Sequence, residues 1–156
     1  MFSLFIKTAV LIVVLILLAG VVLTIRTQSG ANQEQFLGGK IPASLPDGFY
    51  KGYADFSTFS WQGKNFNAAG MTGENVLAAG SSTVEKYPFT LSEGKGIRDL
   101  KLDVIRLDYD RPENPFWLRP ALDEMVEVAP GTFMGKIHYR LIPYFPFSLG
   151  YFNLMK

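Results

Sequence analysis

The sequence predicts an all-β domain, an antiparallel β-barrel, preceded by one N-terminal transmembrane helix. First, an uncharged run from Thr8 to Ile25 is long enough to cross a bilayer. Second, aromatic residues are frequent after residue 36, and Gly and Pro recur every few positions. Third, short stretches there alternate between apolar and polar residues without a helical period, which is typical of barrels and sandwiches.

The N-terminal run has 13 Leu, Ile and Val residues among its 18 positions. As a helix it would be about 27 Å long, close to the thickness of a bilayer core. We therefore expect residues 1–25 to be the anchor of a single-pass protein, with the domain on the periplasmic or extracellular side. A cleaved signal peptide is the alternative, because Lys7 precedes the run and Ser29-Gly30-Ala31 matches a small-x-small cleavage site.

Residues 26–35 (RTQSGANQEQ) are polar and have no apolar period. We expect a flexible tether that reaches roughly 17 Å as a random coil. It would hold the domain, residues 36–156, close to the lipid bilayer.

Turn residues divide this domain into candidate strands. The candidate strands are 49–53, 56–61, 64–68, 74–79, 83–90, 96–109, 125–129, 132–142 and 147–154. Between residues 100 and 110 the apolar phase slips by one position, which indicates a β-bulge or a barrel corner. Residues 124–141 are predicted as a hairpin that turns at Pro130-Gly131. A short helix over Trp117–Glu124 is a further possibility, with Pro120 in its first turn.

Charge and composition exclude several classes of function. The 15 basic and 14 acidic residues nearly balance, so a nucleic-acid partner is not expected. The chain has no Cys and a single His, His138, which excludes thiol chemistry and multi-histidine metal sites. We expect no metal, no cofactor and no catalytic motif. His138 is interpreted as a structural or surface residue, with haem ligation as the alternative.

Aromatic residues on the predicted strands are candidates to line the barrel interior. They are Phe59, Trp61, Phe66, Phe133 and Tyr139. A barrel of about eight strands is either filled by its own side chains or holds one small ligand. The sequence leaves both possibilities open.

The motif Gly48-x-Tyr50-x-Gly52 suits a closed barrel end, where the ring would act as a plug and the glycines would allow close approach. A plain strand edge is the alternative. This motif, the following WQGKNF at 61–66, and later ALDEMVEV (121–128), TFMG (132–135), PF (146–147) and YFNL (151–154) resemble the GXWXG-domain proteins. That resemblance implies a lipocalin-like barrel over most of residues 46–154, with Tyr50 in place of the family's Trp. The family has no agreed activity.

We therefore expect a membrane-anchored binding protein that holds a small apolar ligand or lipid inside the barrel. One alternative is a structural or assembly domain that binds another membrane protein through a filled barrel. Another is a small barrel enzyme acting on a lipid or polyketide, with Asp55 or Asp123 as general base. A cavity separates the first two, and the third requires a buried carboxylate among the aromatic residues.

Overall fold

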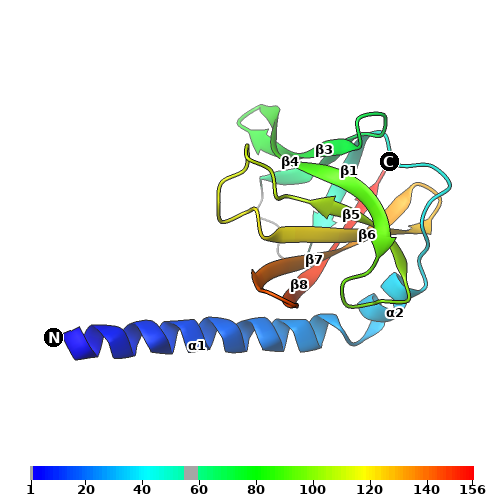
Figure 1. Ribbon diagram of the computed structural model, residues 1–156. Coiled ribbons are helices and arrows are strands. Elements are labelled where there is room, and N and C mark those ends of the chain that lie inside the picture. Colours follow the sequence, from blue (N-terminus) through cyan, green and yellow to red (C-terminus); the bar gives the residue numbers. More distant parts are fainter. Residues whose placement is uncertain (1, 55–59) are drawn as a thin grey trace.

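The computed structural model describes residues 2–54 and 60–156, and within them the strands close into one antiparallel β-barrel (Figure 1). Two helices precede it, α1 (Phe2–Thr27) and α2 (Ala31–Leu37). The strands are β1 (Gly48–Ala54), β2 (Trp61–Asn67), β3 (Thr72–Ala79), β4 (Ser82–Lys95), β5 (Asp103–Asp108), β6 (Ala121–Ala129), β7 (Thr132–Ile142) and β8 (Phe145–Met155). The predicted all-β barrel with an N-terminal helix is confirmed.

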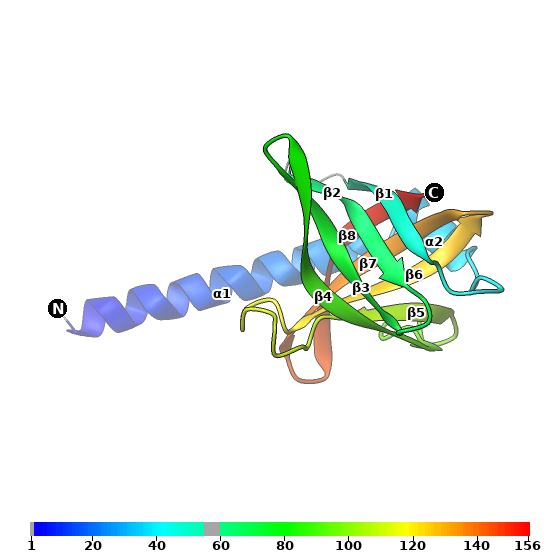
Figure 2. The same ribbon diagram turned by 90° about the horizontal axis from the view of Figure 1, so that it is seen from above.

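Each strand pairs with its neighbour in sequence, and β1 pairs with β8 to close the barrel (Figure 2). Closure leaves no open sheet edge. The register of β6 with β7 runs to the pair Ala129↔Thr132, so the predicted hairpin is confirmed. Gly131 in its turn has a φ of 70°, a left-handed conformation that favours glycine.

Helix α1 is long and apolar enough to cross a membrane over the 24 residues Leu4–Thr27. Its apolar side chains are exposed along most of its length, and a helix that is apolar all round needs either a protein core or lipid around it. The first part of α1 projects away from the barrel (Figure 1). Its last two turns, from Gly20 onward, pack along β8.

The segment between α1 and the barrel differs from the expected flexible tether. Residues 31–37 form α2, which packs on β6 and β7 with Gln33 and Phe36 buried. The sequence did not predict this packing because the segment is polar. The surface that receives Gln33 is polar as well, so no apolar pattern was needed for the contact. The linker is therefore a docked helix.

The β-bulge that the slip between residues 100 and 110 predicted, as one of two alternatives, is wrong. Strand β5 is limited to Asp103–Asp108 and pairs with β4 and β6 in an unbroken register. Val104 and Ile105 are both fully buried, Val104 in the cluster that contains Phe36 of α2 and Ile105 in the barrel interior. The change of phase marks a strand that is covered on both faces.

Two further predictions are changed by the structure. Residues 115–120 form turns, and β6 begins at Ala121, so the short helix considered for Trp117–Glu124 is absent from this described part of the chain. Most of the strand predicted at 56–61 lies outside the described residues, and Trp61 begins β2.

The barrel has two distinct ends. Antiparallel alternation places the β3–β4 turn at 80–81, the segment 109–120 and the β7–β8 turn at 143–144 at one end, here called the upper end. The first part of α1 projects past this end (Figure 2). The turns at 68–71, 96–102 and 130–131 form the lower end.

Candidate ligand-binding cavity

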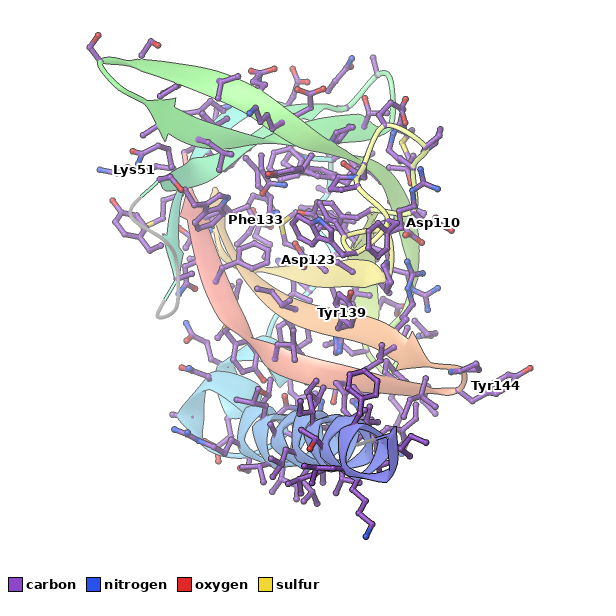
Figure 3. The ribbon with its side chains drawn as sticks, turned by 90° about the vertical axis from the view of Figure 1, so that its left-hand side faces the viewer. Lys51, Asp110, Asp123, Phe133, Tyr139 and Tyr144 are labelled. Carbon is purple, nitrogen blue, oxygen red and sulfur yellow. The ribbon has the colours of Figure 1, made fainter. Side chains whose placement is uncertain are left out.

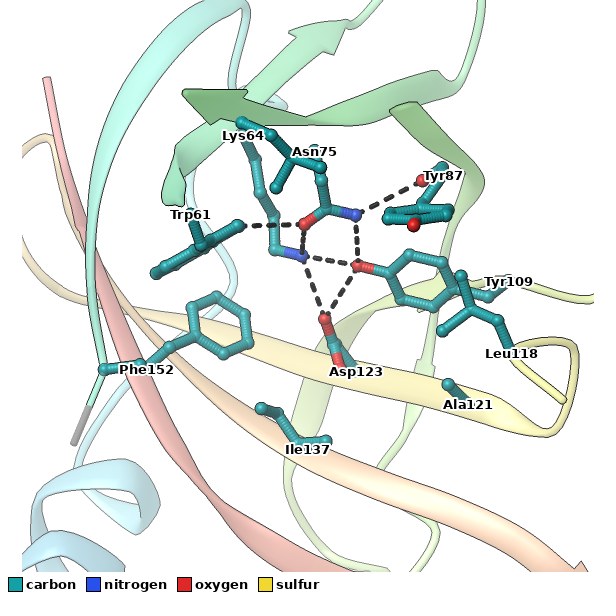
Figure 4. Close-up of a pocket in the computed structure, with 12 residues that line it drawn as sticks. Trp61, Lys64, Asn75, Tyr87, Tyr109, Leu118, Ala121, Asp123, Ile137 and Phe152 are labelled. Atoms are coloured by element: carbon teal, nitrogen blue, oxygen red, sulfur yellow. Dashed lines mark hydrogen bonds and ion pairs between the residues drawn. The ribbon is translucent and has the colours of Figure 1, made fainter. Parts of the chain in front are cut away.

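A cavity of about 300 Å³ lies inside the barrel, toward its upper end (Figure 4). Its walls are mainly aromatic and aliphatic. The lining residues are Ala54, Trp61, Lys64, Asn75, Leu77, Tyr87, Tyr109, Leu118, Ala121, Asp123, Ile137 and Phe152. The barrel is therefore not completely filled by its own side chains.

One wall of the cavity carries a buried polar cluster, here called the inner network. Its members are Lys64 on β2, Asn75 on β3, Tyr109 after β5 and Asp123 on β6. Lys64 Nζ donates to Asn75 Oδ1 at 3.0 Å, to the Tyr109 hydroxyl at 2.5 Å and to Asp123 Oδ2 at 3.0 Å. These three bonds use every hydrogen of the ammonium group.

The remaining groups of the inner network are also paired. Tyr109 donates its hydroxyl hydrogen to Asp123 Oδ2 at 3.1 Å. Asn75 Nδ2 donates to the Tyr109 hydroxyl and to the Tyr87 carbonyl, while its Oδ1 also accepts from Trp61 Nε1 at 3.0 Å. A buried polar cluster is stable when its donors and acceptors are paired in this way.

Burial and charge set the electrostatics of this wall. Burial lowers the pKa of Lys64, while the Asp123 carboxylate opposes that shift. Burial, reinforced by Asp123, raises the pKa of Tyr109 well above its ordinary value. The ammonium group also lies within a cage of aromatic rings, 4.9 Å from the Phe152 centroid and 5.1 Å from that of Phe89, at distances typical of cation–π contacts.

This arrangement bears on what the cavity can do chemically. Lys64 and Asp123 neutralise each other, so the wall offers no unpaired charge to a ligand. Two donors already occupy Asp123 Oδ2, which leaves this oxygen poorly placed to accept a further proton from a substrate. The other carboxylate considered as a base, Asp55, lies outside the described residues. Asp123 is the buried carboxylate among aromatic residues that the enzyme alternative requires, although Lys64 and Tyr109 already occupy its Oδ2.

The predicted lining residues lie in different parts of the structure. Trp61 lines the cavity. Phe66 and Phe133 are buried deeper, each packed edge-on against the ring of Tyr50 at 5.6 and 5.5 Å between centroids. Tyr139 packs against the same core from the upper end, and its hydroxyl donates to the Trp117 carbonyl. Phe59 lies outside the described residues.

Tyr50 fills the lower part of the barrel, beneath the cavity, and is buried. Gly48 has a φ of 78°, which favours glycine. A Cβ on Gly52 would lie 2.3 Å from the Trp61 ring, so the indole rests directly on this glycine. The roles predicted for the Gly48-x-Tyr50-x-Gly52 motif remain predictions, although this packing suits a plugged lower end.

Sequence reasoning missed Lys64, Asn75 and Tyr109 as cavity residues. A signal was present, because side chains two positions apart share one face of a strand. Phe66 had been predicted to point inward, so Lys64 should have been expected on the same face. Charged residues are seldom buried unless paired, and the partner of Lys64 lies 59 positions away in sequence.

A second buried polar cluster lies on the outer face of β6, β7 and β8, under the two helices. In this outer network Lys136 Nζ donates to Gln33 Oε1 and to Asp99 Oδ2, both at 2.7 Å. The Tyr151 hydroxyl approaches Gln33 Oε1 at 2.6 Å. Burial lowers the pKa of Lys136, with Asp99 opposing the shift, and raises the pKa of Tyr151 above its ordinary range.

The same outer network includes His138. Its Nε2 lies 3.2 Å from Glu124 Oε2 and its Nδ1 lies 3.0 Å from Ser148 Oγ. Thr24 of α1 accepts the backbone N–H of Ser148 at 3.0 Å, and Glu124 accepts the N–H of Ile97. Because both ring nitrogens are engaged outside the barrel, His138 has no free nitrogen for an axial haem ligand.

The chain Ser148–His138–Glu124 has the order of a nucleophile, a base and an orienting carboxylate. All three side chains are completely buried, however, and Ser148 is covered by α1. A nucleophile must reach its substrate, so we assign this chain to the docking of α1. Among residues 2–54 and 60–156, no three His, Asp or Glu side chains converge as in a metal site.

Comparisons with known proteins bear on the fold alone. No family model matches the chain, and no curated protein matches it. A crystal structure of a protein from Thermomonospora curvata is similar, with a TM-score of 0.54 and 16% sequence identity over 76% of this chain and 79% of that chain. This likeness agrees with the barrel and carries no information on the ligand.

Proposed function

We propose that this protein is a membrane-anchored binding protein whose barrel holds one small, neutral and mainly apolar molecule at the membrane surface. The observation that carries the proposal is the cavity of about 300 Å³, whose lining residues lie toward the end of the barrel past which α1 projects. Pockets that bind small molecules are typically concave and apolar with a few fixed polar groups.

The cavity volume limits the size of the ligand. At the packing density of protein interiors, about 0.75, a space of this size accommodates roughly a dozen non-hydrogen atoms. A ten-carbon isoprenoid or a short acyl chain meets that limit. A full-length diacyl lipid does not.

The inner network supports a neutral ligand. A carboxylate or phosphate on the ligand would face Asp123 and would have to compete for Lys64, whose donors are all used. Removing one partner from a buried ion pair is strongly unfavourable. A hydroxyl or carbonyl group needs no such exchange and can lie beside the pair.

The contacts of α1 support an uncleaved anchor. Cleavage after Ala31 would remove Thr24, which accepts the buried N–H of Ser148. It would also remove Thr27, whose carbonyl accepts from the Tyr151 hydroxyl at 2.7 Å. Cleavage would therefore break the hydrogen bonds that join α1 to β8 and expose the face of β8 that α1 covers. Extraction of the protein by alkaline carbonate, or a mature N-terminus at Asn32, would instead support a signal peptide.

The proposed orientation places the N-terminus in the cytoplasm and the barrel on the other side. A protease added to intact cells or spheroplasts should then cleave the chain near Ser29 without heating. After mild heating has unfolded the barrel, the same protease should degrade the barrel as well. Full protection under both conditions would reverse the orientation.

The binding test uses the full chain in detergent, delipidated, with Trp117→Phe so that Trp61 is the reporter. Geraniol should shift the emission of Trp61, because the indole lines the cavity. Geranic acid has the same carbon skeleton and should bind about tenfold more weakly or worse, because of its charge. Trp61→Ala, whose binding is measured by isothermal titration calorimetry because it removes the reporter, should weaken geraniol by roughly 1 kcal/mol or more.

Ala121→Phe is the matched control, because it places a ring in the cavity and leaves the inner network intact. We expect this variant to fold and to lose the response to geraniol. If neither compound changes the emission of Trp61 in the parent chain, the binding proposal fails. The structural or assembly domain then becomes the better reading.

A further inference from the structure

The upper end of the barrel and the free part of α1 point in the same direction. Figure 3 looks along α1 at this end, with the helix seen end-on and Tyr144 at the tip of the β7–β8 hairpin beside it. The packing fixes this geometry, because a Cβ on Gly20 would lie 2.8 Å from the ring of Phe147. Ser148, the next residue of β8, donates its N–H to Thr24 one turn further along the helix.

The length of α1 determines how deep this end must lie. Only the 12 residues Thr8–Ala19 lie between Lys7 and Gly20, which packs on Phe147 of the barrel. They span about 18 Å, well short of a bilayer core of about 30 Å. A complete crossing therefore has to include the following turns of α1, where Val22 and Ile25 are 55% and 64% exposed. These same turns pack on β8.

Exposed apolar side chains lie on two segments at this end of the barrel, 116–117 and 141–145. The aromatic rim, as we define it, consists of Phe116, Trp117, Leu141, Ile142, Tyr144 and Phe145. Phe116 is 82% exposed, and the ring of Tyr144 is fully exposed. Trp and Tyr are enriched where proteins meet the headgroup region of a bilayer.

Among the described turns of this end, only the segment 109–120 carries charge. The β3–β4 turn, Ala79-Gly80-Ser81-Ser82, has no charged residue. Within 109–120 the two acidic and two basic side chains balance, with Asp110 exposed and Arg111 paired with Glu113 at 2.9 Å.

We propose that the upper end of the barrel is a membrane-contacting surface, with the aromatic rim in the headgroup region and the cavity open against the lipid. The inference rests on the proposed function and adds the surface by which the ligand arrives. Leu118 links the two, because it lines the cavity and directly follows Trp117 of the rim. An apolar ligand then passes between bilayer and cavity without crossing bulk water.

The test is the depth of Trp117 in vesicles. The full chain with Trp61→Phe, reconstituted in phosphatidylcholine with brominated acyl chains, should show strong quenching of Trp117. The matched control carries Leu100→Trp in a chain with both natural Trp residues replaced by Phe. Leu100 is as exposed as the rim but lies at the lower end, so its quenching should be about that of a Trp in water.

A second variant tests the rim itself. Phe116→Asp with Tyr144→Asp should reduce the quenching of Trp117 by about half or more, because charge is unfavourable in the interface. Leu100→Asp should leave it unchanged. Equal, weak quenching at positions 117 and 100 overturns the surface proposal. Geraniol binding in detergent does not depend on the rim, so its failure would refute the function and leave the depth measurement interpretable.

Discussion

Two buried lysines, one inside the barrel on β2 and one on the outer face of β7, have different surroundings. Lys64 lies inside the barrel, bonded to Asp123 of β6 beside an open cavity. Lys136 lies on the outer face of β7, bonded to Asp99 and to Gln33 of α2, with no exposed side-chain surface. Burial lowers the pKa of both lysines.

The difference lies in what completes each network. The inner network takes all its partners from the barrel, so it exists whether or not α1 and α2 are docked. The outer network takes Gln33, Thr24 and Thr27 from the helical segment, so it is complete only when the helices are docked. One buried polar cluster thus lines the cavity, and the other holds α1 and α2 against the outer face of the barrel.

The largest expected effect separates the two lysines directly. Lys136→Met should cost about 3–5 kcal/mol of unfolding free energy, because it leaves the Asp99 carboxylate without its ion-pair partner under α2. Lys64→Met should cost less, about 1–2 kcal/mol, because water in the cavity can solvate the carboxylate that remains. Chemical denaturation of the full chain in mild detergent measures both.

Lys95→Met is the control for this pair of variants. Lys95 also forms an ion pair, with Asp103 at 2.7 Å, but both side chains are more than half exposed. Its loss should change stability by no more than about 0.5 kcal/mol. If Lys64→Met is as costly as Lys136→Met, the cavity does not admit water and the contrast between the two faces disappears.

The fold was largely predictable from the sequence, and the two networks were not. Alternation of apolar and polar residues located the strands because it requires only local pattern. It fails for β6, where Asp123 faces the cavity, Glu124 lies under the helices and both are buried. Polar residues are usually exposed, so the pattern placed such side chains in solvent. Their burial depends on partners that lie far away in sequence.

Substitution of Gly52 tests the packing inside the barrel, with a smaller expected change in the unfolding free energy. Gly52→Val should destabilise the chain by about 1–3 kcal/mol, because the new side chain would overlap the Trp61 ring and the Gly63 Cα. Displacement of the indole should also weaken geraniol. Gly38→Ala, after α2, is the control, since its Cβ meets only ordinary contacts at 3.5 Å. An unchanged midpoint for Gly52→Val would remove the role given to this glycine.

Substitution of Thr24 tests the docking of α1 on the outer face, with a similar or smaller expected change in the unfolding free energy. Thr24→Val keeps the shape of the side chain but leaves the buried N–H of Ser148 without an acceptor, which should cost about 1–2 kcal/mol. Thr8→Val is a matched control, because Thr8 makes the same hydroxyl bond to the carbonyl four residues earlier on an exposed part of α1. Equal effects at both positions would argue against a docked helix.

The smallest expected effect is the pH dependence contributed by Lys64. Its pKa in the folded chain is below the ordinary value of 10.5, so the unfolded chain binds more protons between those two values. The cost of burying the ammonium is present in full below the folded pKa and declines as the pH rises toward 10.5. The unfolding free energy of the parent chain should therefore rise with pH in this window relative to Lys64→Met. Above pH 10 the raised pKa of Tyr109 acts in the opposite sense, because the folded chain then retains the phenol proton.

Saturating geraniol should enlarge the rise of the unfolding free energy with pH, since a ligand that displaces water from the cavity further disfavours the charged amine of Lys64. The corresponding difference between the parent chain and Lys136→Met should not respond to geraniol, because the outer network has no contact with the cavity. A response at Lys136 equal to that at Lys64 would mean that the two networks are coupled.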